Sequence, residues 1–283
     1  MDRRTLAREL SAIENGELTV DEEEGKIVAI TGPPGVGKSC LVDSILQRLA
    51  PAKRIAVLAV DPTSPLSGGA LLGDRIRLSV LDDESKSDSI YVRSIATRSS
   101  AGSVPSIVRD LSYHLLSKKF DIVIIETVGA GQSEMRCAAI ANRIIVVEGP
   151  ARGDGVQAEK AGLLELADLI VVNKSDLDGA ERVVNDLQMS LSITDDAPPI
   201  ISTSTKTNQG LDQLSELILD LEERLSSKRA RFRQQLIMAH ESKLITNPNF
   251  EVVLDRMSEE GLSLVDALRA VSYTHLTLPT ISD

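Results

Sequence analysis

The feature that most constrains this chain is a glycine-rich run at residues 32–39, which reads Gly-Pro-Pro-Gly-Val-Gly-Lys-Ser. It matches the spacing G-x-x-x-x-G-K-[ST], in which backbone N–H groups surround a phosphate, the lysine reaches the β- and γ-phosphates and the serine binds Mg²⁺. Apolar residues predict a buried strand at 26–31 before the run and a helix at 40–49 after it. This order of strand, loop and helix predicts a phosphate-binding loop rather than a glycine-rich turn that binds nothing.

This loop supplies most of the expected nucleotide contacts. We assign nucleotide binding to Gly32, Pro34, Gly35, Val36, Gly37, Lys38, Ser39 and Cys40. Lys38 is expected to act in catalysis by stabilising charge on the β- and γ-phosphates, and Ser39 is expected to ligate Mg²⁺.

Strands and helices alternate along the chain, which predicts an α/β fold of the P-loop NTPase class, with a mostly parallel sheet covered on both faces. We expect strands near residues 26–31, 54–60, 90–94, 121–126, 143–147, 168–172 and 199–202. We expect helices near residues 37–49, 103–118, 156–166, 178–190 and 210–225. Ligands of such sheets bind at the carboxyl ends of the strands, where the motifs of this chain fall.

The chain divides into four expected parts. A helical extension at 1–25 precedes the nucleotide-binding domain at 26–226, and a charged helical arm follows at 227–271. The arm either mediates dimerisation or packs on the core as a solvated helix. Residues 272–283 are dense in threonine and lose the helical period, so we interpret them as a non-native cloning or sequencing read-through.

Composition excludes several classes of partner. The net charge of −11 argues against nucleic acid and against an anionic membrane surface. No apolar run approaches the roughly 20 residues that cross a bilayer, and we find no signal peptide. Two cysteines, Cys40 and Cys137, form no C-x-x-C pair, which favours a reducing cytoplasm.

A second motif indicates guanine as the base. Asn173-Lys174-Ser175-Asp176 follows an apolar strand and has the pattern N-K-x-D. The carboxylate of Asp176 can accept hydrogen bonds from the guanine imino and amino groups, which adenine lacks at that edge. Asn173 is expected to tie neighbouring loops together, and the Lys174 stem to cover the base. The alternative is an ordinary helix cap by Ser175 or Asp176.

A third segment, at residues 202–206, is expected to form a second base loop. Ser202, Thr203 and Ser204 are assigned to nucleotide binding there. The sequence resembles the usual S-A-x-K, with Thr203 where alanine is usual and one extra residue before the lysine.

Carboxylates at two strand ends predict a magnesium site. Asp61 and Glu126 end two of the expected strands, and carboxylates there can hold Mg²⁺ directly or through water. Asp74 lies in a glycine- and proline-rich segment that suits a mobile loop over the nucleotide, unless it is a passive connector. With Ser39, these residues form the expected metal set. Gly129 is expected to let its backbone approach the γ-phosphate.

The group that positions the attacking water is harder to identify. Gln132 is chemically suitable, although its spacing from Gly129 differs from the common GTPase pattern. We assign Lys38, Glu126 and Gln132 to catalysis and expect intrinsic hydrolysis to be slow and partner-stimulated.

Together these segments resemble the metallochaperone-type GTPases that serve the cobalamin-dependent methylmalonyl-CoA mutase, including sequences once labelled arginine/ornithine transport ATPases. The residues that carry the resemblance are 32–39, 61–65 with 68–69 and 73–74, 126–134, and 167–176, with the helix at 2–8. The run Glu126-Thr127-Val128-Gly129-Ala130-Gly131-Gln132 is the most family-specific, because ordinary small GTPases carry D-x-x-G there.

The resemblance implies a homodimeric GTPase that binds GTP and GDP with Mg²⁺. It implies gating of adenosylcobalamin transfer into a cobalamin-dependent acyl-CoA mutase and help in expelling inactivated cofactor. It also implies a dimerisation arm at 227–270 and a loop at 149–160 that signals the nucleotide state to the mutase. Cys40, where threonine is common, and Gly155, where an acidic residue is usual, depart from the family pattern.

Three other functions remain open. A nickel-delivering metallochaperone GTPase would need a Cys/His cluster, whereas the three histidines and two cysteines of this chain are not grouped in sequence. A P-loop kinase or transport ATPase would need an acceptor site or a membrane partner, and the N-K-x-D motif argues against it. A switch that binds GTP and barely hydrolyses it differs from our expectation only in rate.

Overall fold

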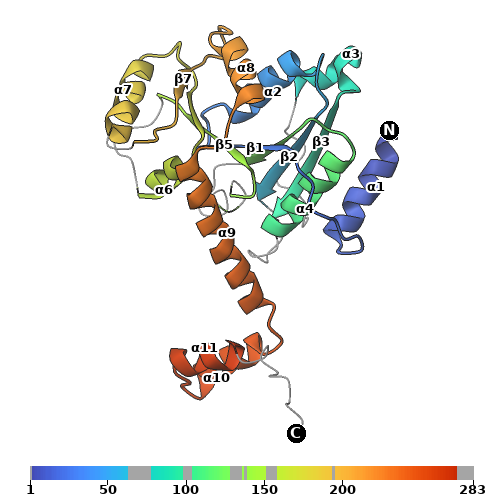
Figure 1. The fold of residues 1–283 in the computed structure, drawn as a ribbon, viewed down its shortest axis with the longest axis vertical. Helices are drawn as coiled ribbons and strands as arrows, with labels where there is room; N and C mark the ends of the chain where they lie inside the picture. The colour runs from blue at the N-terminus through green and yellow to red at the C-terminus, as the bar shows by residue number, and fades with distance from the viewer. Residues whose placement is uncertain are drawn as a thin grey trace. The chain divides into compact units, whose positions relative to one another are not determined.

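A computed structural model describes residues 2–62, 78–97, 104–127, 136, 139–150, 158–192 and 195–272. Its centre is a seven-stranded, wholly parallel sheet in the order β3-β2-β4-β1-β5-β6-β7 (Figure 1). The strands are β1 (Lys26–Thr31), β2 (Ile55–Pro62), β3 (Ile90–Thr97), β4 (Ile122–Thr127), β5 (Arg143–Glu148), β6 (Leu169–Val172) and β7 (Ile200–Ser202). The predicted fold class is therefore confirmed.

Helices connect the strands and extend the chain at both ends. The α-helices are α1 (Arg3–Glu14), α2 (Lys38–Leu49), α3 (Glu84–Ser87), α4 (Val104–Ser117), α6 (Ala158–Leu166), α7 (Ala180–Leu191), α8 (Leu211–Asp220), α9 (Leu225–Ile245), α10 (Phe250–Glu259) and α11 (Leu264–Ser272). A short 3-10 helix, η1 (Ser79–Asp82), precedes α3. None of the described helices is long and apolar enough to cross a membrane.

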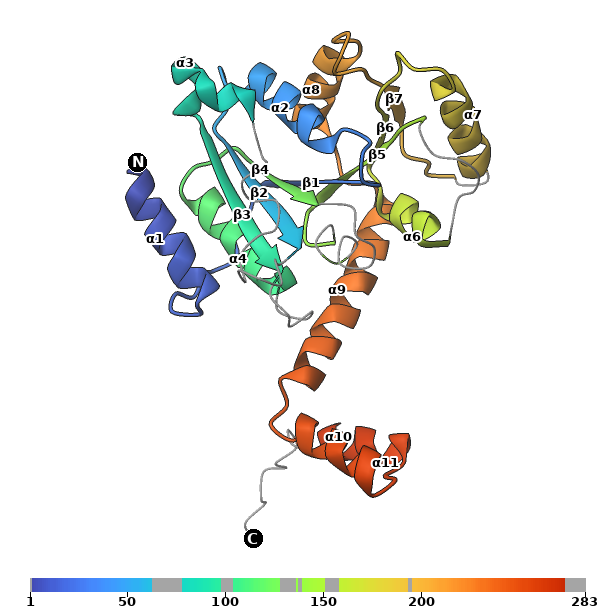
Figure 2. The ribbon, with the colours of Figure 1, turned by 180° about the vertical axis from the view of Figure 1, so that it is seen from behind.

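Alternate residues of each strand pack on opposite faces of the sheet, as the two-residue period of a strand requires. On one face, residues such as Ala29 and Ile125 pack with α1, α4, α6 and α7. On the other face, residues such as Val28 and Ile124 pack with α2 and α8. Figures 1 and 2 show α1 beside α4 and α2 beside α8. Both faces of the central strands are therefore buried, and their carboxyl ends are left for a site.

The chain divides into two compact units, residues 1–234 and 235–283. The first two turns of α9 bury Ser227 and Arg231, and these turns belong to the first unit.

The second unit has a small apolar core of its own. Val253 of α10 packs with Ala267 and Val271 of α11. The chain turns between α9 and α10, where the Asn247 side chain donates to the carbonyl of Val271 at 2.8 Å. The helices α10 and α11 therefore complete the expected helical arm. Of the suspected non-native residues 272–283, Ser272 ends α11 and the others lie outside the described part of the chain.

Candidate nucleotide-binding site

The glycine-rich run forms a loop between β1 and α2 at the carboxyl end of the central strand. Gly32 and Gly37 have positive φ angles of 142° and 92°. A Cβ atom on Gly32 would lie 2.1 Å from the carbonyl oxygen of Val147, and one on Gly37 would lie 2.7 Å from Nδ2 of Asn173. Both positions therefore require glycine, for backbone conformation and for space.

Lys38 begins α2 and lies within this loop. Its side chain is buried, and Nζ donates to the carbonyl oxygens of Gly32 at 2.5 Å and Pro33 at 3.1 Å. These bonds hold the ammonium inside the loop, where backbone N–H groups and the amino end of α2 favour an anion. The geometry fits the predicted role of Lys38 toward phosphate charge.

Ser39 and Glu126 form the polar pair beside the loop. The Ser39 hydroxyl donates to Oε1 of Glu126 at 2.5 Å, and Glu126 is only 6% exposed. Glu126 reaches this position because β4 pairs with β1, with Glu126 opposite Ile30. A hydroxyl and a buried carboxylate are hard oxygen ligands of the type that Mg²⁺ prefers, so these two residues fit the ion.

Only part of the expected metal and hydrolysis set can be placed. Asp61 lies at the end of β2, the strand next to β4, although its side chain is not among those described. Asp74, Gly129 and Gln132 lie outside the described residues, as does most of the 149–160 loop. Cys40 is placed on α2 as an exposed free thiol.

Asn173 ties the base motif to the phosphate loop, as predicted. It is fully buried, and its Nδ2 donates to the carbonyl of Val36 at 2.9 Å. Thr203, at the end of β7, donates its hydroxyl to Oδ1 of Asn173 at 3.2 Å, which fixes the orientation of the amide. Nζ of Lys174 donates to the carbonyl of Gly35 at 2.7 Å, so the motif contacts the loop twice.

Asp176 is oriented by the second base loop. Oδ1 accepts a hydrogen bond from the Ser204 hydroxyl at 2.6 Å, and Nζ of Lys206 lies 3.9 Å from Oδ2. The Ser204 hydrogen bond, more than the nearby lysines, holds the pKa of Asp176 below its usual value. The carboxylate is therefore ionised near neutral pH and can accept the two donors of a guanine edge.

The same contacts correct two readings of the sequence. The helix-cap alternative is wrong, because the residue before α7 is Gly179 and no side chain caps that helix. The serine that contacts the Asp176 carboxylate is Ser204. Only Thr205 stands between Ser204 and Lys206, one residue fewer than in S-A-x-K, whereas counting from Ser202 gave one residue more. Thr203 is fully buried and orients Asn173 from within the protein. The triplet S-T-K at 204–206 was the signal that could have given this alignment.

Comparison with known proteins identifies the family. The sequence profile described as "Methylmalonyl Co-A mutase-associated GTPase MeaB" matches residues 13–260. The chain belongs to the MeaB family of GTPases. This finding confirms the resemblance that the motifs predicted, and membership of a GTPase family implies that this MeaB-family chain binds GTP.

Two relatives and one solved structure agree with the assignment. A putative GTPase of Pyrococcus abyssi is 35% identical over 292 residues, which cover 92% of this chain and 89% of the relative. A fused isobutyryl-CoA mutase of Cupriavidus metallidurans is 34% identical over 200 residues, which cover 66% of this chain and 18% of that protein. The crystal structure of a LAO/AO transport system kinase superposes with a TM-score of 0.64 over 96% of this chain and 92% of that one. At 23% identity, it supports the fold alone.

Proposed function

We propose that this MeaB-family GTPase is a chaperone that gates adenosylcobalamin loading into a cobalamin-dependent acyl-CoA mutase of the methylmalonyl-CoA mutase type and protects the mutase. The observation that carries the proposal is the match of residues 13–260 to a family described as mutase-associated. The Cupriavidus relative adds support, because a GTPase-like segment there forms part of a chain named as a mutase.

In this proposal, the chain's own residues bind the triphosphate and stabilise charge. Lys38 neutralises charge on the β- and γ-phosphates, and its burial in the loop strengthens that interaction. Asn173 and Asp176 hold the guanine, and Gly129 lets the backbone approach the γ-phosphate. Ser39 and Glu126 would hold Mg²⁺, supported by Asp61 and Asp74. When bound, this ion supplies charge neutralisation across the phosphates.

In this proposal, the rate of GTP hydrolysis depends on how the attacking water is positioned beside the γ-phosphate. We assign that role to Gln132, in the segment that follows Glu126 in the chain. Because its spacing from Gly129 differs from the common GTPase pattern, we infer a slow intrinsic rate that rises when the mutase binds.

The helical arm supports a homodimer. Within α9, the only fully buried side chains are Ser227 and Arg231, both in its first two turns. The later turns of α9 and the helices α10 and α11 expose large apolar side chains, namely Phe232, Leu236, Ile237, Ile245, Val252, Leu254, Leu264, Val265 and Leu268. An isolated helix gains little stability in water, so a second copy of the arm that covers these side chains would stabilise it.

Cofactor uptake by a purified apo-mutase tests this function. Absorbance would follow transfer of adenosylcobalamin to the mutase with the chain in its GTP-bound form, in its GDP-bound form, or absent. We expect the nucleotide state to change the extent of uptake, and the Lys38→Ala variant to lose this dependence. Uptake that is indifferent to the chain in both states would contradict the chaperone role while leaving the GTPase assignment intact.

A further inference from the structure

The two strands that carry the base site are held at their opposite ends by one helix. At their carboxyl ends, β6 leads to Asn173 and Asp176, and β7 leads to Thr203 and Ser204. Before their amino ends stand two aspartates, Asp168 before β6 and Asp196 before β7. Both aspartates bind residues 223–231, which we call the α9 root.

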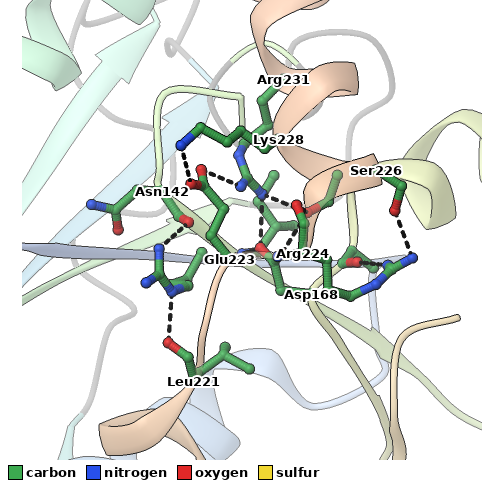
Figure 3. A network of polar contacts seen from close by, with 12 residues as sticks. Asn142, Asp168, Leu221, Glu223, Arg224, Ser226, Lys228 and Arg231 are labelled. Carbon is green, nitrogen blue, oxygen red and sulfur yellow. Dashed lines mark hydrogen bonds and ion pairs between the residues drawn. The ribbon is translucent and has the colours of Figure 1, made fainter. Parts of the chain in front are cut away.

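Asp168 is the buried centre of this contact. It is 1% exposed, and its carboxylate accepts hydrogen bonds from the Ile144 N–H, the Arg224 N–H, the Ser227 hydroxyl and Nη1 of Arg231. Three of these four donors belong to the α9 root, and Figure 3 shows Arg231 pointing toward Asp168 and Glu223. Arg231 is 2% exposed, and its other nitrogen donates to Glu223 at 2.6 Å. A carboxylate with four donors holds its partners in one arrangement.

Arg224 joins the two strands through a single guanidinium. Nη1 donates to the carbonyl of Ala167, at the start of β6, and Nε lies 3.3 Å from Oδ1 of Asp196, before β7. The backbone N–H and hydroxyl of Ser226 also donate to Oδ2 of Asp196, at 3.3 and 2.8 Å. The Arg224 side chain is 11% exposed, so solvent screens its contacts only partly.

The amino end of α9 depends on these contacts. Arg224 precedes the helix and has no side-chain acceptor, and the first turn contains no acidic residue. Asp168 and Asp196 bind the N–H groups of Arg224 and Ser226 in place of a local cap, and their negative charges suit the positive end of the helix dipole. The α9 root is therefore bound to the strands rather than merely adjacent to them.

We propose that the α9 root is a clamp across the amino ends of β6 and β7, and that it controls release of the guanine nucleotide by holding the two strands in the register the base site needs. The inference rests on the proposed base site. β6 has only four residues and β7 only three. A displacement of their amino ends would therefore also move their carboxyl ends, where the Thr203–Asn173 and Ser204–Asp176 hydrogen bonds lie. The helix α9 continues from the root into the arm. A protein that binds the arm could therefore change the rate of nucleotide release through α9.

The dissociation rate of a fluorescent GDP analogue, chased with excess GDP, tests the clamp. Arg224→Gln removes the bridge between the strands, and we expect release to become about five- to tenfold faster, the scale of the net contribution of one ordinary hydrogen bond. Arg224→Lys keeps the positive charge and one donor group. Its dissociation rate should therefore lie between that of Arg224→Gln and that of the wild type. Arg182→Gln on α7 is the matched control, because it removes the same charge from an ion pair that is 80% exposed on the arginine side.

A second measurement separates the clamp from general loosening of the fold. In the wild-type protein, GDP should slow hydrogen exchange at the Ser226 and Ser227 amides, and in Arg224→Gln this slowing should be lost. If Arg224→Gln does not fold, Asp196→Asn breaks the same bridge from a side chain that is 47% exposed. A melting temperature that stays near wild type excludes loss of fold as the cause of faster release.

Asp176→Asn in the same release assay distinguishes the two possible failures. If Asp176→Asn leaves release unchanged, the proposed base site is wrong. If Asp176→Asn speeds release while both Arg224→Gln and Asp196→Asn match the Arg182→Gln control, the base site stands and the clamp is overturned.

Discussion

The Ser204 hydroxyl donates to the Asp176 carboxylate at 2.6 Å, and this bond joins the loops that follow β7 and β6. The bond lowers the pKa of Asp176. It also fixes the position of Oδ1, which leaves Oδ2 able to face a ligand. In the proposed base site, the carboxylate that would bind guanine is therefore positioned by two strand ends together rather than by the N-K-x-D motif alone.

Asp176→Asn should shift the nucleotide preference from GTP toward xanthosine triphosphate. The amide can donate to the xanthine oxygen, whereas it no longer accepts both guanine donors. We expect GTP affinity to fall roughly tenfold to a hundredfold, as when a hydrogen bond to a charged group is lost. Competition between the two triphosphates for a fluorescent GDP analogue measures the shift. An unchanged preference would place the base site elsewhere.

Lys38→Ala should abolish hydrolysis without unfolding the protein. The side chain bonds to the carbonyls of Gly32 and Pro33 in the loop, and it belongs to neither of the apolar clusters that pack the two faces of the sheet. We expect turnover to fall about a hundredfold or more, as when a group that stabilises charge in the transition state is removed. Phosphate release measures turnover, and circular dichroism monitors the fold. Wild-type turnover in this variant would refute the phosphate-loop assignment.

Arg231→Met should destabilise the first unit strongly. It leaves the Asp168 carboxylate buried beside an apolar side chain, and removing one partner of a buried ion pair costs roughly 3–5 kcal/mol. The pair Asp168→Asn with Arg231→Met should cost less than the sum of the single changes, because neither charge is then left alone. Urea unfolding monitored by circular dichroism measures each variant. Additive effects would show that the two side chains contribute independently.

Glu9→Gln should weaken the attachment of α1 to α4 in a pH-dependent way. Oε2 of Glu9 lies 2.8 Å from Nζ of Lys118 and 2.8 Å from Nε2 of His114. The hydrogen bond from Lys118, then that from His114, lowers the pKa of Glu9 from its ordinary 4.5. A lowered carboxyl pKa gives stability that is present above the unfolded value and is lost as pH falls through the folded value.

The wild type should therefore exceed Glu9→Gln in unfolding free energy by about 0.5–1 kcal/mol near neutral pH. The difference should shrink as pH falls below 4.5 toward the lower folded pKa. Urea titrations across this range measure it. A difference that stays constant into strongly acid solution would contradict the assigned ion pairs.

Local pattern was enough to predict the sheet and the phosphate loop. The apolar run before Gly32 and the helical spacing after Lys38 are contiguous in sequence, and the structure places both as expected. The N-K-x-D motif likewise falls at the end of β6, because a parallel strand places the residues that follow it at the carboxyl edge of the sheet.

Contacts between distant segments were not predictable in the same way. Arg231 reads as one more charge on a charged helix, yet it is buried against Asp168, 63 residues away in sequence. That pairing joins the start of α9 to the first unit. Sequence alone assigned Ser202, Thr203 and Ser204 alike to the second base loop, and only the contact with Asp176 distinguishes Ser204.

The GTP hydrolysis rate, measured alone and with a purified cobalamin-dependent acyl-CoA mutase, tests the central claim most directly. The proposal predicts a slow rate for the chain alone and a several-fold rise with the mutase, because hydrolysis by GTPases of this type depends on groups that a partner orients or supplies. The Lys38→Ala variant should show neither rate. A wild-type rate that is fast alone, or that the mutase leaves unchanged, would contradict the account.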